Sequence, residues 1–372
     1  MNILMVTNEF PPRIGGIQTH VYELSRALVK LGHHVYVLTR LKDPSLPKEE
    51  TREGINIFRC KLVNSHLVYN WQLRRKLREL INTFNIDIVH VHGMRPLEGC
   101  KNLAIPVIFT NHTSSFIKRS QQGKNVQLKM LKQLKVADAI LAPSQILADQ
   151  TRATGYAGPI RFISNGVDIE KFSPGVSGVR NKLNIPESAF VIIMAGRLHA
   201  VKGVVYLAKA LSLLSHPDLH VIVVGEGSEK NEFETITRSS PCADHIHMLG
   251  SIPNDDMPDF YRAADVSILP SLMEATSITG LEAMACGLAV IGTNVGGLPV
   301  IINDGVNGLL VEPKSAEALA GAIQNLLSDR RLTKNMGQDG RKRAVNEFSW
   351  ARIAQHVLDS YNHIKQKFHP HD

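Results

Sequence analysis

Short apolar runs alternate with stretches of helical periodicity along the whole chain of 372 residues. The runs predict strands at 3–7, 35–39, 57–59, 88–91, 107–110, 139–142 and 161–163, and then at 191–195, 220–225, 246–249, 266–269, 289–292 and 309–311. Because nearly every residue in these runs is apolar, each strand is expected to be covered on both faces, as in a parallel sheet. Regular strand–helix alternation predicts a doubly wound α/β fold.

The length of the chain favours two domains. Glycine and proline are dense between residues 165 and 180, which indicates a linker, and a fresh strand begins near Phe190. We therefore expect two Rossmann-like domains, 1–170 and 171–349, with a last helix at about 350–372 that packs back on the first domain. Ligands of such folds bind beyond the carboxyl ends of the strands, so the active site is expected in the cleft between the domains.

Composition excludes several classes of protein. Apolar residues make up 44% of the chain and charged residues 20%, an ordinary globular mixture. The four cysteines show no Cys-x-x-Cys spacing, which argues against a zinc ribbon or a disulfide scaffold and fits a reducing cytoplasm. The first apolar run is too short for a signal peptide, and no run reaches the length of a membrane span. A cytoplasmic protein is expected, with a peripheral place on the inner face of the membrane left open.

The positive charge is concentrated in the first half. Residues 1–168 contain 23 Lys and Arg against 12 Asp and Glu, whereas the remainder contains 19 against 22. Two basic runs, 74–78 and 118–135, account for much of the excess. They fit either solvated helix faces or attraction to an anionic acceptor or membrane surface. Nucleic acid is disfavoured because no recognition module accompanies the charge.

The segment 270–293 contains the most informative pattern. Glu274 and Glu282 stand eight positions apart, with small and hydroxylated residues between them and an apolar strand on either side. The order is strand, acidic loop, helix N-terminus, and a second acid one turn inside the helix. Carboxylates accept hydrogen bonds from sugar hydroxyls, and a helix N-terminus attracts phosphate. The segment therefore predicts a site for a phosphorylated, polyhydroxylated ligand.

Two glycine-containing turns follow predicted strands. Gly15 and Gly16 open a helix after the first strand, where backbone amides can approach an anion, although the spacing is not Gly-x-Gly-x-x-Gly. Arg197 and Lys202 follow the strand at 191–195 and together can neutralise a diphosphate leaving group without a metal. A simple turn and a surface pair of cations are the alternative interpretations.

The motifs occur in one order along essentially the whole chain: Pro11–Gly16, Gly196–Gly203, and Glu274–x7–Glu282 followed by Ala-Met-Ala-Cys-Gly. Together with the hinge motif Asn-Gly-Val-Asp at 165–168, this order resembles the retaining glycosyltransferases of family 4, which have the GT-B fold. The resemblance implies that Arg197 and Lys202 hold the donor's diphosphate, and that Glu282 binds the ribose.

The resemblance implies further roles at the reacting centre. Glu274 would contact the transferred sugar, and the amides that would touch the sugar and the distal phosphate belong to Ser277, Ile278 and Thr279. Gly15 and Gly16 would offer amides to the phosphates from the other side. His112, after the strand at 107–110, matches a family histidine beside the reacting atoms. His90 and His92 are interpreted as packing or as a wall of the cleft.

The expected reaction moves a hexosyl group from a nucleoside diphosphate, with UDP the commonest in the family, to a hydroxyl of a lipid, a polysaccharide or a small metabolite. The resemblance implies retention at the anomeric carbon. Because Asp-x-Asp does not occur, no metal is expected, and no further cofactor is expected either. A sugar-nucleotide epimerase and a non-catalytic sugar-binding protein are the alternatives. One departure stands out: the family often has Glu-Gly-Phe-Gly where this chain has Glu274-Ala275-Thr276-Ser277. Donor identity is therefore open.

Overall fold

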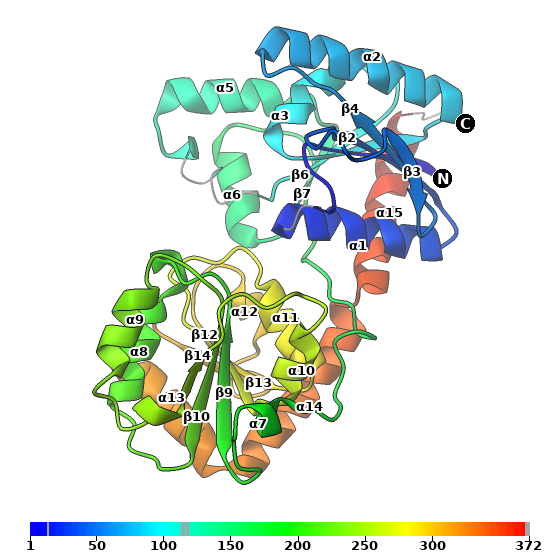
Figure 1. Cartoon of the computed structure of the whole chain (residues 1–372). Helices are drawn as coiled ribbons and strands as arrows, with labels where there is room; N and C mark the ends of the chain where they lie inside the picture. The colour runs from blue at the N-terminus through cyan, green and yellow to red at the C-terminus, as the bar shows by residue number, and fades with distance from the viewer. Residues whose placement is uncertain (13–14, 113–115, 117–118, 369–372) are drawn as a thin grey trace. The chain divides into compact units, whose positions relative to one another are not determined.

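The computed structural model describes residues 1–12, 15–112, 116 and 119–368 (Figure 1). The chain divides into two compact units. Unit 1 contains residues 1–166 together with the C-terminal segment from Trp350, and unit 2 contains residues 167–349. The first unit ends at residue 166 in the structure, whereas the sequence predicted the boundary after residue 170.

Unit 1 is built on one twisted sheet. Its strands are β1 (Asn2–Thr7), β2 (His34–Arg40), β3 (Glu49–Arg52), β4 (Ile55–Cys60), β5 (Ile88–His92), β6 (Val107–Thr110), β7 (Ala139–Ala142) and β8 (Ile160–Phe162). They lie in the order β3-β4-β2-β1-β5-β6-β7-β8, and every pair is parallel except β3 with β4. The sequence did not predict β3, because its residues are polar and mostly exposed at the edge of the sheet.

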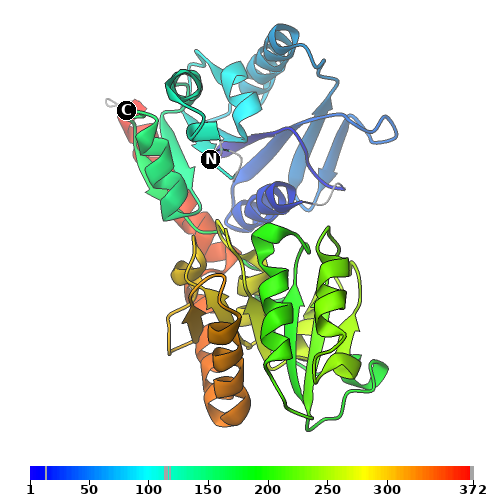
Figure 2. The same ribbon diagram turned by 90° about the vertical axis from the view of Figure 1, so that its left-hand side faces the viewer.

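Helices cover both faces of this sheet, as Figures 1 and 2 show. The helical elements of unit 1 are α1 (Gly16–Lys30), α2 (His66–Phe84), α3 (Met94–Leu97), the 3-10 turn η1 (Glu98–Cys100), α5 (Lys124–Leu134), α6 (Gln145–Ala153) and α15 (Trp350–Phe368). One face of the sheet packs on α1 and α15 through buried residues such as Val21, Leu24 and Tyr361. Helix α15 thus belongs to unit 1 although it follows unit 2 in the sequence.

Unit 2 has a six-stranded sheet. Its strands are β9 (Phe190–Ala195), β10 (Leu219–Val224), β11 (Ile246–Met248), β12 (Val266–Leu269), β13 (Ala289–Thr293) and β14 (Gly308–Val311). All pairs are parallel, in the order β11-β10-β9-β12-β13-β14. The helical elements are α7 (Val179–Lys182), η2 (Ala200–Lys202), α8 (Val204–Ser212), α9 (Lys230–Thr237), η3 (Ala243–His245), α10 (Met257–Arg262), α11 (Ile278–Ala285), α12 (Leu298–Ile301), α13 (Ala316–Ser328) and α14 (Arg330–Glu347).

Alternate residues of the central strand β9 build the two cores of unit 2. Phe190, Ile192 and Met194 pack in the core that includes α8 and α13, whereas Val191 and Ile193 pack in the core that includes α11. All six residues of β9 are buried, which explains why the strand has no polar alternation. The predicted doubly wound α/β architecture is confirmed. No helix of the described residues is both long and apolar enough to cross a membrane.

Candidate active site

In unit 2 the predicted ligand-binding residues lie on the loops that follow β9 and β12 and on helix α11, beyond the carboxyl ends of these strands. Backbone hydrogen bonds tie these loops together: Gly196 N donates to Val224 O at 2.9 Å, and Leu272 N donates to Val201 O at 2.8 Å. The loop after β13 joins them through Gly297 N, which donates to Glu274 O at 3.0 Å. The motif residues, far apart in the sequence, are thereby held on one edge of one sheet.

Two glycines allow the close approach of these loops. Gly203 has φ of +65°, and a Cβ there would overlap the carbonyl oxygen of Pro270. Gly296 has φ of +57°, and a Cβ there would overlap the carbonyl oxygen of Glu274. In both places the left-handed backbone and the lack of space favour glycine. The last residue of the Gly196–Gly203 motif is therefore needed to seat the loop that carries Glu274.

The two cations expected at the diphosphate have different surroundings. Lys202 Nζ forms an ion pair with Glu274, whose side chain is only 11% exposed. The Arg197 side chain is exposed and has no hydrogen bond or ion pair with any residue that the structure describes. Lys202 and the sugar-binding candidate Glu274 thus act as one unit before a ligand arrives, whereas Arg197 is free to meet an anion.

Helix α11 begins beside this pair. The side chain of Ser277 caps the helix, since its Oγ accepts a hydrogen bond from Gly280 N at 3.1 Å. The amides of Ile278 and Thr279 point out of the first turn, and within the described chain no partner for them is found. The Thr279 and Ser277 hydroxyls lie 3.2 Å apart. The helix start therefore offers amides and one further hydroxyl to a ligand, as an anion site requires.

Glu282 lies one turn inside α11 and is 6% exposed. One carboxylate oxygen accepts from Asn254 Nδ2 at 3.1 Å, and the other accepts from the Tyr261 hydroxyl at 3.1 Å. Burial raises the pKa of Glu282 to about 7, although both hydrogen bonds oppose the rise. Asn254 and Tyr261, before and on α10, were not singled out in the sequence. They hold the carboxylate that is proposed to bind the ribose.

Unit 1 has a pocket of about 320 Å³ at the carboxyl ends of β1 and β5. Polar side chains line much of it: Asn8, Glu9, Gln18, His92, Arg95 and Arg119. Gly15 and Gly16 stand at the start of α1; Gly16 is exposed, and a Cβ there would meet open space. Of the predicted loop between Pro11 and Gly16, Arg13 and Ile14 lie outside the described residues.

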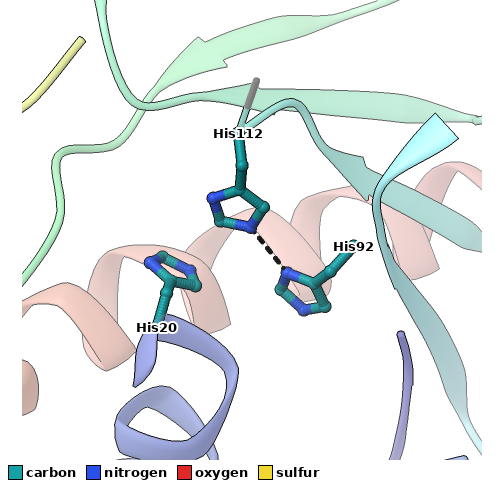
Figure 3. Close-up of side chains that lie close together, drawn as sticks. All are labelled: His20, His92 and His112. Carbon is teal, nitrogen blue, oxygen red and sulfur yellow. Dashed lines mark hydrogen bonds between the residues drawn. The ribbon is translucent and has the colours of Figure 1, made fainter. Parts of the chain in front are cut away.

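Three histidines from different elements meet beside this pocket (Figure 3). His20 comes from α1, His92 ends β5, and His112 follows β6. His92 Nδ1 and His112 Nε2 are 2.9 Å apart, and the rings of His20 and His112 meet edge to face with centroids 4.4 Å apart. His20 was not recognised in the sequence. His90, by contrast, is fully buried between Tyr361 and Thr110, and its interpretation as packing holds.

The hydrogen-bonding atoms define the state of these rings. Burial lowers the pKa of His20 to about 4 and holds the pKa values of His92 and His112 well below 6.5, so the rings are neutral at pH 7. His92 Nε2 lies 3.5 Å from Met5 Sδ, which can only accept a hydrogen bond. His92 Nδ1 is then the acceptor for His112 Nε2–H. The remaining nitrogen of His112, Nδ1, carries a lone pair for a ligand's hydroxyl.

The same three rings are also the described group with spacing suited to a metal ion, because their ligand atoms all lie within 4.8 Å of one another. Hydrogen bonds already engage four of their six ring nitrogens. His92 is bonded to His112, and His20 Nδ1 is bonded to Asn165 Oδ1 at 2.8 Å. The three neutral imidazoles are therefore held by hydrogen bonds to protein groups and by ring contacts with one another, and His112 Nδ1 keeps its lone pair.

Comparison with known proteins matches both halves of the chain. The protein-family model described as Glycosyltransferase Family 4 matches residues 14–171. The protein-family model described as Glycosyl transferases group 1 matches residues 178–343. An uncharacterized glycosyltransferase of Methanocaldococcus jannaschii is 26% identical over 97% of this chain and 98% of its own. Sucrose-phosphate synthase of Thermosynechococcus elongatus is 25% identical, with a TM-score of 0.84 and 98% of each chain covered. HepE of Anabaena, solved with UDP-glucose, shares the fold at 20% identity and a TM-score of 0.76 over 98% of this chain and 100% of its own.

Proposed function

The chain belongs to the group 1, family 4 glycosyltransferases of GT-B fold, and from this premise we propose a retaining hexosyl transfer from a nucleoside-diphosphate sugar to an acceptor hydroxyl. One observation carries the proposal. Arg197, the Lys202–Glu274 pair and the start of α11 meet at the carboxyl ends of β9 and β12. Cations for a diphosphate, a carboxylate for sugar hydroxyls and free helix amides are the groups that a nucleotide sugar needs.

The diphosphate is bound by Arg197 and Lys202. The ammonium of Lys202 has three donors, so it can keep its bond to Glu274 while it donates to a phosphate oxygen. The pair then links two parts of the donor, with Glu274 on the sugar hydroxyls and Lys202 on the leaving group. As the bond from the sugar to the diphosphate breaks, these cations and the start of α11 stabilise the growing negative charge. This neutralisation supports a reaction without a metal or other cofactor.

The nucleoside is bound through Glu282. The ribose hydroxyls donate to the carboxylate, which retains accepting capacity beside Asn254 and Tyr261 because each oxygen has two lone pairs. UDP is the proposed nucleotide. The complex of the Anabaena fold neighbour with UDP-glucose supports a nucleotide sugar of this kind.

The acceptor is bound by unit 1. Attack occurs on the face from which the diphosphate departs: the acceptor oxygen bonds to the anomeric carbon, the bond to the diphosphate breaks, and the acceptor proton passes to the departing phosphate oxygen. Neutral His112 accepts a hydrogen bond from a sugar or acceptor hydroxyl through Nδ1 and orients it. The amides of Gly15 and Gly16 supply further donors toward phosphate.

A panel of nucleotide sugars tests the proposal. UDP-, GDP- and ADP-linked hexoses are compared by the thermal shift that each produces and by the release of nucleoside diphosphate. A donor that stabilises the protein and loses its sugar with retained anomeric configuration supports it. Conversion of the intact donor to its epimer would favour the epimerase. Stabilisation without any sugar release, in the presence of lipid, polysaccharide and small-molecule acceptors, would favour a sugar-binding protein.

A further inference from the structure

Helix α2 of unit 1 has an apolar stripe on each side. The inner stripe, Tyr69, Leu73, Leu77 and Leu80, is buried in unit 1. The outer stripe begins with Leu67 and Trp71, which are 80% and 62% exposed. Since residues three or four apart share a helix face, Arg75 and Arg78 lie on the same outer face. Both arginines are exposed.

The exposed apolar side chains are concentrated at the start of α2. The described residues include thirteen large hydrophobic side chains that are exposed, and four of them, Val63, Leu67, Val68 and Trp71, lie within nine positions. The other tryptophan, Trp350, is 8% exposed and packs in the core. A tryptophan next to two aliphatic side chains in water is unfavourable unless another phase or molecule covers it.

The charges beside these side chains indicate what covers them. Lys76 is paired with Glu79, and Arg74 is turned toward the backbone at Glu98. Arg75 and Arg78, by contrast, have no ion-pair partner in the part of the chain that the structure describes. An apolar strip with an aromatic residue, followed by unpaired cations on the same face, is typical of helices that lie at the surface of an anionic membrane.

We propose that the outer face of α2 docks on an anionic bilayer, with Leu67 and Trp71 in the interface and Arg75 and Arg78 at the headgroups. A stable protein partner is a poorer fit, because such an interface needs about 800 Å² on each side and four side chains supply much less. A bilayer requires only that a few apolar side chains enter it while the cations stay at the phosphates.

Docking of α2 would bring the unit 1 pocket to the membrane. The Tyr69 hydroxyl donates to Asn8 Oδ1 at 2.5 Å, and the Arg95 guanidinium lies 4.7 Å from the centroid of the Tyr69 ring. Asn8 and Arg95 both line that pocket. Resting on the proposed function, this contact favours a lipid as the acceptor among the three classes.

Vesicle binding tests the docking independently of catalysis. The full chain is sedimented with vesicles of phosphatidylcholine alone and with 30% phosphatidylglycerol, at low and high salt. Binding to the anionic vesicles is expected to fall as salt rises. The double variant Arg75→Gln/Arg78→Gln is expected to bind about 25-fold more weakly, at about fivefold for each charge removed. The double variant Leu67→Ser/Trp71→Ser is expected to bind more than about tenfold more weakly, because two large apolar side chains no longer enter the interface. Leu213→Ser, which changes a 57% exposed leucine of unit 2, is the matched control and is expected to bind as wild type does.

Tryptophan emission gives a second readout. Because Trp350 is already buried, a blue shift on addition of anionic vesicles reports on Trp71. No sedimentation and no blue shift at low salt would overturn the proposal. Equal loss of binding in Leu213→Ser would overturn it as well. A protein that binds no vesicles but self-associates with rising concentration, and loses this self-association in Leu67→Ser/Trp71→Ser, would also overturn it. Donor hydrolysis is expected to be unchanged in the α2 variants, so failure of docking is distinguished from failure of the proposed transfer.

Discussion

Replacement of Arg197 by alanine separates ligand binding from folding. The side chain is exposed and has no partner among the described residues, so its loss is expected to change the free energy of unfolding by less than about 0.5 kcal/mol. A charged hydrogen bond from a guanidinium to a phosphate contributes about 1.5–3 kcal/mol. If Arg197 makes that bond to the departing diphosphate, kcat/KM is expected to fall roughly 10- to 150-fold at unchanged Tm.

The assay is the initial rate of nucleoside-diphosphate release with the donor found in the panel, at several donor concentrations. Arg238→Ala is the matched control, since this exposed arginine at the end of α9 has no ion-pair partner within the described chain. A loss mainly in kcat would show that Arg197 stabilises the charge of the transition state, and a loss mainly in KM would show binding of the ground state. A kcat/KM within twofold of wild type in Arg197→Ala would refute the diphosphate assignment.

Four further outcomes are expected. Lys202→Met leaves the mostly buried Glu274 without its cation, so both Tm and the transfer rate are expected to fall; an unchanged Tm in thermal unfolding would contradict the pairing. A chelator is expected to leave the transfer rate largely intact, and a complete loss restored by added metal would exclude the metal-free reaction. Glu282 has a pKa of about 7 in the folded protein and 4.5 in the unfolded chain, so the folded protein keeps a proton that the unfolded chain releases. The free energy of unfolding is therefore expected to fall by roughly 3 kcal/mol as the pH rises through this window. Glu282→Gln lacks this proton, so its stability relative to wild type is expected to increase from pH 5 to pH 8, as measured by chemical denaturation. His90 has a pKa of about 3 in the folded protein, whereas the same ring in the unfolded chain takes up a proton below pH 6.5. The free energy of unfolding is therefore expected to fall as the pH is lowered from 6.5, and this fall is expected to be smaller in His90→Gln.

The sequence predicted the elements well because the fold buries its strands on both faces. Near-continuous apolar runs such as 190–195 leave no other place for those residues than the middle of a covered sheet. Strand β3 was missed for the converse reason. Glu49, Glu50 and Arg52 are polar, and they pair with β4 by backbone hydrogen bonds that any side chain permits. The motifs could be placed beyond the carboxyl ends of the strands because each of them directly follows a predicted strand in the sequence.

Contacts across long sequence separations could not be predicted in the same way. The Lys202–Glu274 pair joins residues 72 positions apart, and the bond from His20 to Asn165 joins residues 145 apart. Each residue alone fits a surface charge or a packed ring. Lys202 and Glu274 become partners because the fold brings the loops after β9 and β12 together. His20 and Asn165 become partners because α1 contacts the segment before residue 166.

The stretch after Glu274 is where this chain departs from the glycine-rich pattern common in its family, and the structure gives a physical reading of the departure. Ser277 has φ of −82°, an ordinary conformation for a residue with a Cβ, so glycine is not required there. The close approach is made instead by the facing loop, where a Cβ on Gly297 would overlap the carbonyl oxygen of Ala275. The Ser277 hydroxyl is used in capping α11, which leaves Thr279 as the nearby hydroxyl for a ligand. If residues 275–277 contact the donor sugar as proposed, they act on donor choice through the volume of their side chains rather than through backbone freedom, and the sugar accepted is expected to depend on the size of the side chain at position 275.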